Sequence, residues 1–341
     1  MHKGKIKIHI RNNHWKKGSL PCDLEGEKNS SVPKGLFENF LNKHPEIKDK
    51  VSYLVDWDDD NWKSSMEDAD ILLTWNFPTN NLSKIAPNLK WIHIVSAGVN
   101  HLYPFDWVKK DLVLTNSSGI HSKKAGEFGL MSILMLQNHM TRIITNQKKK
   151  KFVTLLSNPI DSKKVVVIGT GSLGGSMIKH ISSLGAKVIG VNRRGREVKG
   201  CSKVITFDRI DEVLPETDFL YLAVPETKET KGLINKKRLD VLKTTCGIVN
   251  IGRESVMDYE HLRKKLTKNE IAGAILDVFS EEPINRNSKF WNTPNLIITP
   301  HISSDSKGNY IEMVLEKFFK NLKLFIDKKD LLNQIDPNLG Y

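Results

Sequence analysis

Short apolar runs alternate with amphipathic, lysine-rich stretches along the chain. Five runs in the first third are rich in β-branched and aromatic residues and are predicted to be strands: Ile6–Ile10, Val51–Val55, Ile71–Trp75, Trp91–Val95 and Leu112–Thr115. Helix-like segments such as Gly35–Lys43 and Asn81–Ile85 separate them. Strands joined through helical connections predict a parallel α/β sheet.

The same alternation resumes after a long helix-like segment, Ser122 to Lys148, whose apolar residues recur at three- and four-residue steps. Six further strands are predicted: Val165–Ile168, Lys187–Val191, Phe219–Ala223, Gly247–Asn250, Gly273–Asp277 and Leu296–Thr299. A last helical stripe, Tyr310–Asp327, follows this second unit, and we expect it to cross back onto the first. The pattern predicts an α/β protein with two Rossmann-like or flavodoxin-like parallel-sheet domains: a discontinuous one, 1–121 with 304–341, and a second, 122–303.

Composition agrees with two globular domains. The chain has 341 residues, of which 39% are hydrophobic and 27% charged. No run approaches the roughly 18 apolar residues that span a membrane, and the N-terminus lacks the apolar core of a signal peptide, so we expect a cytoplasmic protein. The net charge of +13 is scattered over lysines, which favours anionic small molecules as ligands and gives no reason to expect nucleic acid. The three cysteines are far apart, and we expect neither a disulfide nor a metal.

A glycine-rich turn predicts a dinucleotide site. The apolar run Val165–Ile168 leads into Gly169-Thr170-Gly171-Ser172-Leu173-Gly174, and an apolar-periodic helix follows. In this context Gly169 permits the tight turn, Gly171 lets the backbone approach a pyrophosphate, and Gly174 allows close helix–strand packing. The helix N-terminus then offers free N–H donors to the phosphates.

The end of the next predicted strand bears on which nicotinamide cofactor binds. An NAD site places a carboxylate there to accept from the ribose 2′-hydroxyl. This chain has Asn192 instead, followed by Arg193, Arg194 and Arg196. A guanidinium binds a 2′-phosphate that a carboxylate would repel. We therefore expect NADP(H) to be preferred, without excluding NAD(H).

Three polar residues follow predicted strands of the second domain, where open α/β sheets bind ligands. They are Arg253, Glu282 and His301. Hydride transfer to a 2-oxo acid develops negative charge on the carbonyl oxygen, and His301 can donate a proton to it. Glu282 can hold the imidazole ring and raise its pKa. Arg253 can bind the substrate carboxylate and polarise the carbonyl.

Together these segments resemble the D-2-hydroxyacid dehydrogenase family over nearly the whole chain. The motifs that carry the likeness are Gly169–Gly174, Val224-Pro225 with Thr230, Asn250–Arg253, Leu276–Pro283, Thr299–Ser303, Trp91–Leu102, Asn116–Glu127 and Leu331–Asn333. Within this family, Asn192-Arg193-Arg194 resembles the corresponding residues of the NADP-dependent glyoxylate/hydroxypyruvate reductase branch. The resemblance implies a homodimer formed through the cofactor domain and a small 2-oxo or 2-hydroxy acid as substrate.

The resemblance also assigns the site residues. Arg253, Glu282 and His301 would be catalytic, and the backbone N–H groups of Ala97, Gly98 and Val99 would join Arg253 and His301 in binding substrate. The cofactor would contact Gly169, Thr170, Gly171, Ser172, Leu173, Gly174, Asn192, Arg193, Arg194, Val224, Pro225, Thr230, Ile251, Gly252, Asp277 and Ser303.

Three departures from the family pattern bear on specificity and on dimer contacts. Glu254 replaces the glycine that usually follows the catalytic arginine, and it either weakens the hold of Arg253 on an anionic substrate or points to solvent. Gly126 replaces a common alanine and is expected to loosen the helix that links the domains. The segment 148–164 lacks the usual tryptophan.

Two other hypotheses stay open. One is a nucleotide-sensing, co-repressor-like binding protein without turnover. The other is a dehydrogenase of a larger or phosphorylated hydroxy acid, which would place extra basic residues in the loop Ser96–Leu102. That loop contains no Arg or Lys.

Overall fold

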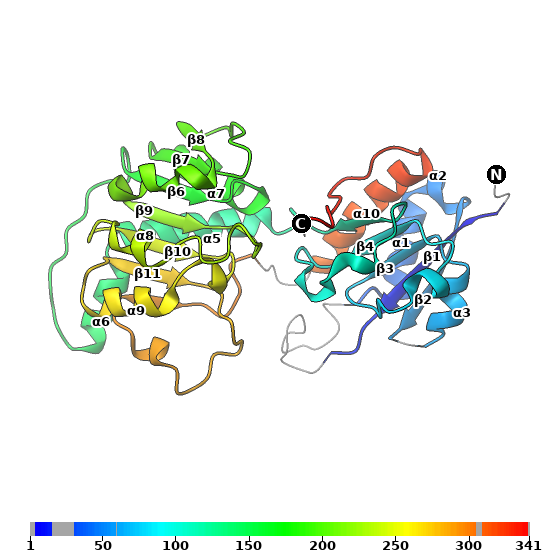
Figure 1. Ribbon diagram of the computed structural model, residues 1–341, viewed down its shortest axis with the longest axis horizontal. Coiled ribbons are helices and arrows are strands. Elements are labelled where there is room, and N and C mark those ends of the chain that lie inside the picture. The colour runs from blue at the N-terminus through cyan, green and yellow to red at the C-terminus, as the bar shows by residue number, and fades with distance from the viewer. Residues whose placement is uncertain (1–3, 16–30, 59, 305–308, 340–341) are drawn as a thin grey trace. The chain divides into compact units, whose positions relative to one another are not determined.

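The computed structural model describes residues 4–15, 31–58, 60–304 and 309–339 and forms two compact units (Figure 1). The first unit comprises Met1–Ile120 with Ser306–Tyr341, and the second comprises His121–Asp305. Cys22 lies outside the described residues. None of the described helices is long and apolar enough to cross a membrane.

The first unit is built on a parallel five-stranded sheet in the order β2-β1-β3-β4-β5. This is the strand order of flavodoxin-like folds. The strands are β1 (Ile6–Asn12), β2 (Val51–Trp57), β3 (Ile71–Thr74), β4 (Trp91–Ile94) and β5 (Val113–Asn116). Most of their residues are buried, as expected of a parallel sheet covered on both faces.

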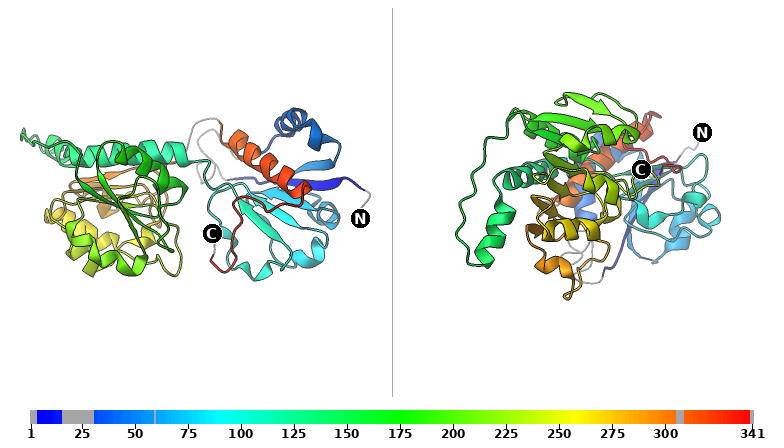
Figure 2. Two further views of the ribbon diagram at one scale, coloured as in Figure 1. Left: turned by 90° about the horizontal axis from the view of Figure 1, so that it is seen from above. Right: turned by 60° about the vertical axis from the view of Figure 1, so that its left-hand side comes forward.

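Helices from both ends of the sequence cover one face of this sheet. Helix α10 (Tyr310–Ile326) lies across it in Figure 2 and shares a core cluster with α1 (Lys34–Lys43). The Phe318 ring stacks on Trp91 of β4 with centroids 4.9 Å apart. The opposite face is covered by α3 (Trp62–Glu67) and α4 (Leu82–Ile85). The C-terminal helix therefore belongs to the first unit, which makes that unit discontinuous. A one-turn helix, α2 (Pro45–Lys48), and two short 3-10 helices, η2 (Asn100–Leu102) and η3 (Phe105–Trp107), complete it.

The second unit is a parallel seven-stranded sheet in the order β12-β11-β10-β9-β6-β7-β8. The chain starts in the middle, runs to one edge and returns to build the other half, which is the Rossmann order. The strands are β6 (Lys164–Ile168), β7 (Lys187–Val191), β8 (Lys203–Ile205), β9 (Phe219–Leu222), β10 (Gly247–Asn250), β11 (Gly273–Leu276) and β12 (Leu296–Ile298). The predicted α/β class with two parallel-sheet domains is confirmed, although the sequence pattern missed the short edge strand β8.

The predicted long helix Ser122–Lys148 is two helices, so that part of the prediction is wrong. Helix α5 (Ser122–Gln137) ends at Asn138, and α6 (Met140–Lys148) begins after His139. His139 has a φ of 56°, a left-handed conformation that Asn and His adopt more readily than most residues. The break therefore comes from the backbone at Asn138-His139, where the apolar spacing gives no signal.

Helices α5 and α7 (Ser172–Ser182) cover one face of the seven-stranded sheet, whereas α8 (Lys236–Asp240) and α9 (Tyr259–Thr267) cover the other. Gly126 of α5 lies against α7, where an added Cβ would come 2.2 Å from Ser176 Oγ. Gly126 therefore permits close packing of α5 on α7, and the expected loosening of the helix stays a prediction. The 3-10 helices of this unit are η4 (Phe207–Glu212), η5 (Leu214–Glu216), η6 (Glu254–Val256) and η7 (Lys289–Asn292).

Candidate active site

The glycine loop between β6 and α7 is shaped by positions where no side chain fits. Gly169 has a φ of 94°, and an added Cβ there would come 2.5 Å from the carbonyl oxygen of Ala223. A Cβ on Gly174 would come 1.8 Å from the carbonyl oxygen of Gly169. A Cβ on Gly171, the N-cap of α7, would meet nothing within 4 Å. The loop is thus tight where it faces the protein and open at the helix N-terminus, which fits an anionic ligand at this end of α7.

Asn192 organises the turn at the end of β7. Its Nδ2 donates to Thr170 Oγ1 at 3.0 Å and to the carbonyl oxygen of Arg196 at 2.9 Å. Its Oδ1 accepts from the N–H groups of Arg194 and Arg196 at 3.2 and 3.1 Å. Because only an amide is both donor and acceptor here, an aspartate could not make the same set of bonds. The side chain therefore couples the arginine turn to the glycine loop.

The arginines of this turn differ in their surroundings. Arg193 Nη2 forms an ion pair with Glu229 Oε1 at 3.2 Å. Arg194 is exposed. Glu229 belongs to the loop that follows β9, so the Arg193–Glu229 pair joins the ends of two strands on either side of β6.

The loop after β9 is held by the hydroxyl of Thr230. That oxygen donates to the carbonyl oxygen of Pro225 at 2.6 Å and accepts from the N–H of Thr227 at 2.8 Å. Val224 is buried, and its carbonyl oxygen would lie 2.5 Å from a Cβ added to Gly252. The loops that follow β6, β9 and β10 thus lie in close contact at the carboxyl edge of the sheet. Ile251, predicted beside the cofactor, is buried there too.

Asn250 and Tyr259 support the loop that carries Arg253. Asn250 Oδ1 accepts from the N–H of Gly252 at 2.9 Å, and its Nδ2 donates to the carbonyl oxygen of Arg253 at 3.0 Å. The same Nδ2 donates to the hydroxyl of Tyr259, which donates in turn to the carbonyl oxygen of Val278 at 3.1 Å. Sequence reasoning did not identify Tyr259, since a tyrosine in an amphipathic helix gives no signal of its own.

Asp277 builds the turn on which His301 stands. Its carboxylate is fully buried and accepts from the N–H groups of Ile302 and Ser303, both at 3.0 Å, and from Thr299 Oγ1 at 2.5 Å. The N–H of His301 donates to the carbonyl oxygen of Asp277 at 3.0 Å, and His301 has a φ of 55°. The structure therefore gives Asp277 an internal structural task. Its predicted contact with the cofactor stays a prediction, as does that of Ser303.

His301 and Glu282 form a hydrogen-bonded pair. Nδ1 of His301 lies 2.7 Å from Oε2 of Glu282, while Oε1 of Glu282 accepts from the N–H of Phe279 at 2.7 Å. An ionised carboxylate only accepts, so the ring carries its proton on Nδ1 toward Glu282 and leaves Nε2 for another partner. The His301 side chain is 31% exposed, which leaves the ring accessible.

The electrostatics of this pair suit proton transfer. The hydrogen bond to Glu282 raises the pKa of His301, although burial and the charge of Arg253 oppose the rise. Burial alone would raise the pKa of Glu282, but the bonds from His301 and the Phe279 N–H together bring it below its ordinary value. Burial lowers the pKa of the Arg253 guanidinium, and the charges of Glu282 and Glu226 counteract this. The structure thus brings Arg253, Glu282 and His301 within electrostatic reach of one another.

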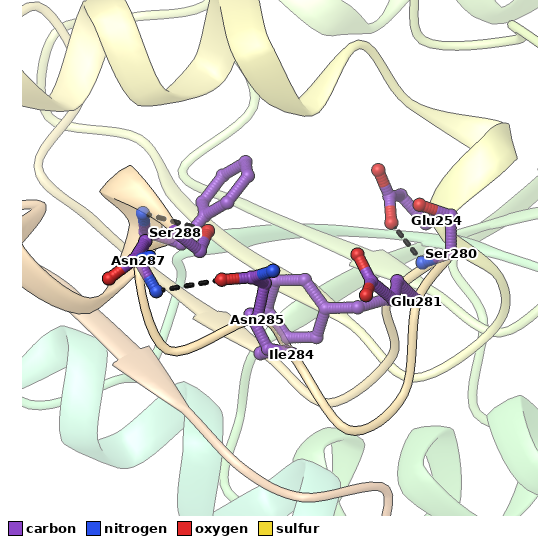
Figure 3. Close-up of a pocket in the computed structure, with 9 residues that line it drawn as sticks. Glu254, Ser280, Glu281, Ile284, Asn285, Asn287 and Ser288 are labelled. Carbon is purple, nitrogen blue, oxygen red and sulfur yellow. Dashed lines mark hydrogen bonds between the residues drawn. The ribbon is translucent and has the colours of Figure 1, made fainter.

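Glu254 is partly buried and hydrogen-bonded, so it does not simply point to solvent, and its expected effect on the hold of Arg253 stays a prediction. Its carboxylate accepts a hydrogen bond from the N–H of Ser280, in the segment between β11 and Glu282 (Figure 3). The acidic side chains that raise the pKa of Arg253 are Glu282 and Glu226. Glu254 also lines a cavity of about 460 Å³ beside that segment, together with Phe279, Ser280, Glu281, Ile284, Asn285, Asn287, Ser288 and Phe290.

The predicted substrate loop, Ala97 to Val99, lies in the first unit. Its carbonyl groups are held by side chains: Ser96 Oγ donates to that of Gly98 at 2.7 Å, and Asn116 Nδ2 to that of Ala97 at 2.8 Å. Within the described parts of the chain, no group accepts a hydrogen bond from the N–H of Gly98 or Val99. The loop can therefore offer backbone donors to an anion.

The neighbouring His93 is structural. It is fully buried, its Nδ1 lies 2.7 Å from Thr115 Oγ1, and burial lowers its pKa to about 3. Among the residues that the structure describes, no group of three or more His, Cys, Asp or Glu side chains could hold a metal ion.

A Rossmann sheet with a glycine loop at one strand end and an Arg–Glu–His group at three others defines a nicotinamide-dependent oxidoreductase. The family model of the D-isomer specific 2-hydroxyacid dehydrogenase NAD-binding domain matches residues 130–303. The glyoxylate reductase of Pyrococcus horikoshii is 30% identical over 249 residues, which is 70% of this chain and 74% of that protein. That of Thermofilum pendens is 33% identical over 64% of this chain and 67% of its own length.

Solved structures agree at the level of fold. A D-isomer specific 2-hydroxyacid dehydrogenase from Xanthobacter autotrophicus, in complex with NADPH, is 22% identical, covers 99% of this chain and 100% of its own, and has a TM-score of 0.79. The NADPH-dependent glyoxylate/hydroxypyruvate reductase of Sinorhizobium meliloti, in complex with NADP, is also 22% identical with the same coverage and has a TM-score of 0.77. The chain belongs to the D-isomer specific 2-hydroxyacid dehydrogenase family and is an NAD(P)-dependent oxidoreductase.

Proposed function

We propose that this enzyme reduces a small 2-oxo acid of the glyoxylate or hydroxypyruvate kind, with NADPH preferred over NADH. The observation that carries the proposal is the arrangement of Arg253, Glu282 and His301 in the cofactor unit. Glu282 occupies Nδ1 of the ring, so the accessible Nε2 can donate a proton to the carbonyl oxygen of the substrate. Arg253 stabilises the negative charge that develops on that oxygen and binds the substrate carboxylate.

The residues of the cofactor unit fit a dinucleotide. When bound, the nicotinamide ring supplies the hydride. The N–H groups at the start of α7 would bind the pyrophosphate beside the open Gly171, with Thr170, Ser172 and Leu173 on the same turn. The remaining contacts proposed from the family pattern are Val224, Pro225, Thr230, Ile251, Gly252, Asp277 and Ser303.

The preference for NADPH rests on the turn after β7. Asn192 carries no charge that would repel a 2′-phosphate, and it holds the backbone of the turn in which Arg193 and Arg194 stand. Two guanidinium groups at this point attract the 2′-phosphate. The neighbours from Xanthobacter and Sinorhizobium, which have NADPH or NADP bound, support the same preference.

The first unit, including α10, is proposed to be the substrate-binding domain. The N–H groups of Ala97, Gly98 and Val99 would bind the substrate carboxylate. The loop Ser96–Leu102 contains no basic residue that would bind a second anionic group, so a short, singly charged acid is favoured. The glyoxylate reductases among the relatives support the same substrate class.

The decisive experiment measures initial rates with a panel of short 2-oxo acids, using NADPH and NADH side by side. We expect glyoxylate or hydroxypyruvate to oxidise NADPH, and NADPH to have the higher kcat/KM. Tight dinucleotide binding without turnover on any acid would instead favour a nucleotide sensor. Turnover confined to phosphorylated or long hydroxy acids would overturn the proposed substrate.

We also propose that the enzyme is a homodimer formed through the cofactor unit. The segment between α6 and β6 runs along the left of Figure 1. Several of its apolar side chains are exposed. Phe152 is fully exposed and Leu156 is 86% exposed. Isolated exposed side chains are common, but large apolar ones grouped in one segment are typical of an interface. Sedimentation should give twice the chain mass, and Phe152→Ser with Leu156→Ser should give the monomer.

A further inference from the structure

Two carboxylates hold consecutive N–H groups of the segment Val278–Glu282. The side chain of Glu282 bends back and accepts from the N–H of Phe279 at 2.7 Å. The next N–H, that of Ser280, donates to the carboxylate of Glu254 (Figure 3). Glu254 is the first residue of η6 and directly follows Arg253. The bond from Ser280 therefore connects the loop of Arg253 to the segment that carries Glu282.

Packing holds the start of this segment, where Val278 is buried and the Phe279 ring contacts Tyr259 and Phe290, but does little to hold the part next to Glu282. The residues from Ser280 to Pro283 are exposed, and the cavity of about 460 Å³ lies beside them. The other described connection to the Arg253 loop runs through the buried hydroxyl of Tyr259, which donates to Val278 at the base of the segment. The bond of Glu254 is made at Ser280, two residues from Glu282 along the chain, whereas that of Tyr259 is made at Val278, further from Glu282.

We propose that Glu254 is a positioning residue, which holds the Val278–Glu282 segment against the Arg253 loop so that Glu282 keeps the ring of His301 in its working orientation. This inference rests on the proposed function of His301. Glu254 acts through its hydrogen bond to the N–H of Ser280, which lies two residues from Glu282. The glutamate that departs from the family pattern thus serves the catalytic pair.

The test compares Glu254→Ala with Glu254→Gln, whose amide oxygen still accepts from Ser280. In Glu254→Ala we expect kcat to fall about five- to twentyfold at nearly constant KM for the 2-oxo acid, since a displaced acid–base pair affects chemistry more than binding. The alkaline limb of the pH profile for reduction should move to lower pH, because a looser Glu282 raises the pKa of His301 less. Glu254→Gln should keep most of the activity and the original limb.

Glu281→Ala is the matched control, since it removes the same charge from the same cavity one residue from Ser280. It should behave like the unaltered enzyme. If Glu254→Ala and Glu254→Gln instead lower the KM equally without a change in kcat, Glu254 acts by repelling the substrate from Arg253 and the proposal is wrong. Unchanged kinetics in Glu254→Ala would also overturn it.

Hydrogen exchange at the Ser280 amide gives a readout that does not require turnover. Exchange should be slow in the unaltered enzyme and in Glu254→Gln, and much faster in Glu254→Ala. If the enzyme reduces none of the 2-oxo acids, the proposed function fails, while this exchange result still decides whether Glu254 holds the segment. Thermal unfolding checks that each variant is folded, and Glu254→Met, which keeps the side-chain length, replaces Glu254→Ala if the latter does not fold.

Discussion

The glycine loop and the catalytic loops lie at the carboxyl edge of one sheet but are built in opposite ways. The loop Gly169–Gly174 has its shape because side chains are absent: a Cβ at Gly169 or Gly174 would run into the backbone. The catalytic loops have their shape because carboxylates accept hydrogen bonds from N–H groups that are distant in the sequence. Asp277 reaches Ser303, 26 residues further along the chain, and Glu254 reaches Ser280, 26 residues away.

The difference shows which kind of damage each region tolerates. Adding one methyl group should disable the glycine loop. The catalytic loops should instead be disturbed by loss of one of the few carboxylates that accept hydrogen bonds from their N–H groups. The cofactor unit also contains two histidine–carboxylate pairs that differ in their surroundings. His301 with Glu282 and His261 with Asp240 both have a 2.7 Å contact, but only the first stands beside Arg253 and the carboxyl ends of β10 and β11.

The largest effect is expected from His301→Asn. General acid–base catalysis contributes about 10²- to 10⁴-fold, and kcat for reduction should fall by this order. His261→Asn is the matched control, since it breaks a pair of the same length on the surface of the same unit. It should leave kcat within about twofold. Steady-state kinetics with NADPH and glyoxylate measures both, and equal losses in the two variants would remove the distinction between the pairs.

Next in size are alanine substitutions in the glycine loop. Gly174→Ala places a Cβ 1.8 Å from a backbone oxygen, so we expect unfolding to become easier by about 1–3 kcal/mol, together with loss of dinucleotide binding. Gly171→Ala meets no protein atom within 4 Å and should keep the melting temperature, while its methyl group obstructs the pyrophosphate and weakens binding.

Thermal unfolding and calorimetric titration with NADP⁺ separate these two outcomes. A Gly171→Ala variant that binds NADP⁺ normally would show that no phosphate approaches this position. A Gly174→Ala variant with unchanged stability would show that the loop has room to shift.

The same contrast explains what the sequence could predict. The glycine fingerprint is local, since its six residues sit between a strand and a helix, and the placement of Arg253, Glu282 and His301 follows from strand ends in a parallel sheet. The bonds of Asp277, Tyr259 and Glu254 join residues far apart in the sequence. They depend on register and side-chain direction, which apolar spacing does not encode.

The fold shows the same limit. Long apolar patterns predicted both sheets and the return of α10 to the first unit, because burial dictates those patterns. The break at Asn138-His139 depends on a single left-handed residue, and the edge strand β8 has only three residues. Neither gives a periodic signal.

The pH dependence comes third. A general acid acts only while protonated, so reduction should be fastest below the pKa of His301 and fall as the pH rises through it. Glu282 raises that pKa above the ordinary 6.5, so the descending limb should lie above pH 6.5, and oxidation of the 2-hydroxy acid should rise over the same range. Glu282→Gln should lower kcat about tenfold and move the limb to lower pH. If the descending limb does not move in Glu282→Gln, a group other than His301 controls the pH dependence of reduction.

The smallest effect concerns the Arg193–Glu229 pair, which joins the turn after β7 to the loop after β9. A 2′-phosphate competes with Glu229 for the guanidinium of Arg193, so Glu229→Gln should tighten NADP⁺ about two- to fivefold, the amount that an exposed ion pair contributes. The affinity for NAD⁺ should not change. Glu212→Gln, which breaks the exposed pair with Arg209 in the same unit, is the control and should affect neither dinucleotide. Isothermal titration of the unaltered enzyme and of both variants measures these affinities for NADP⁺ and NAD⁺. Equal tightening of NADP⁺ and NAD⁺ would mean that Glu229 acts on a part common to both, and Arg193 would then have no share in the preference for the phosphorylated cofactor.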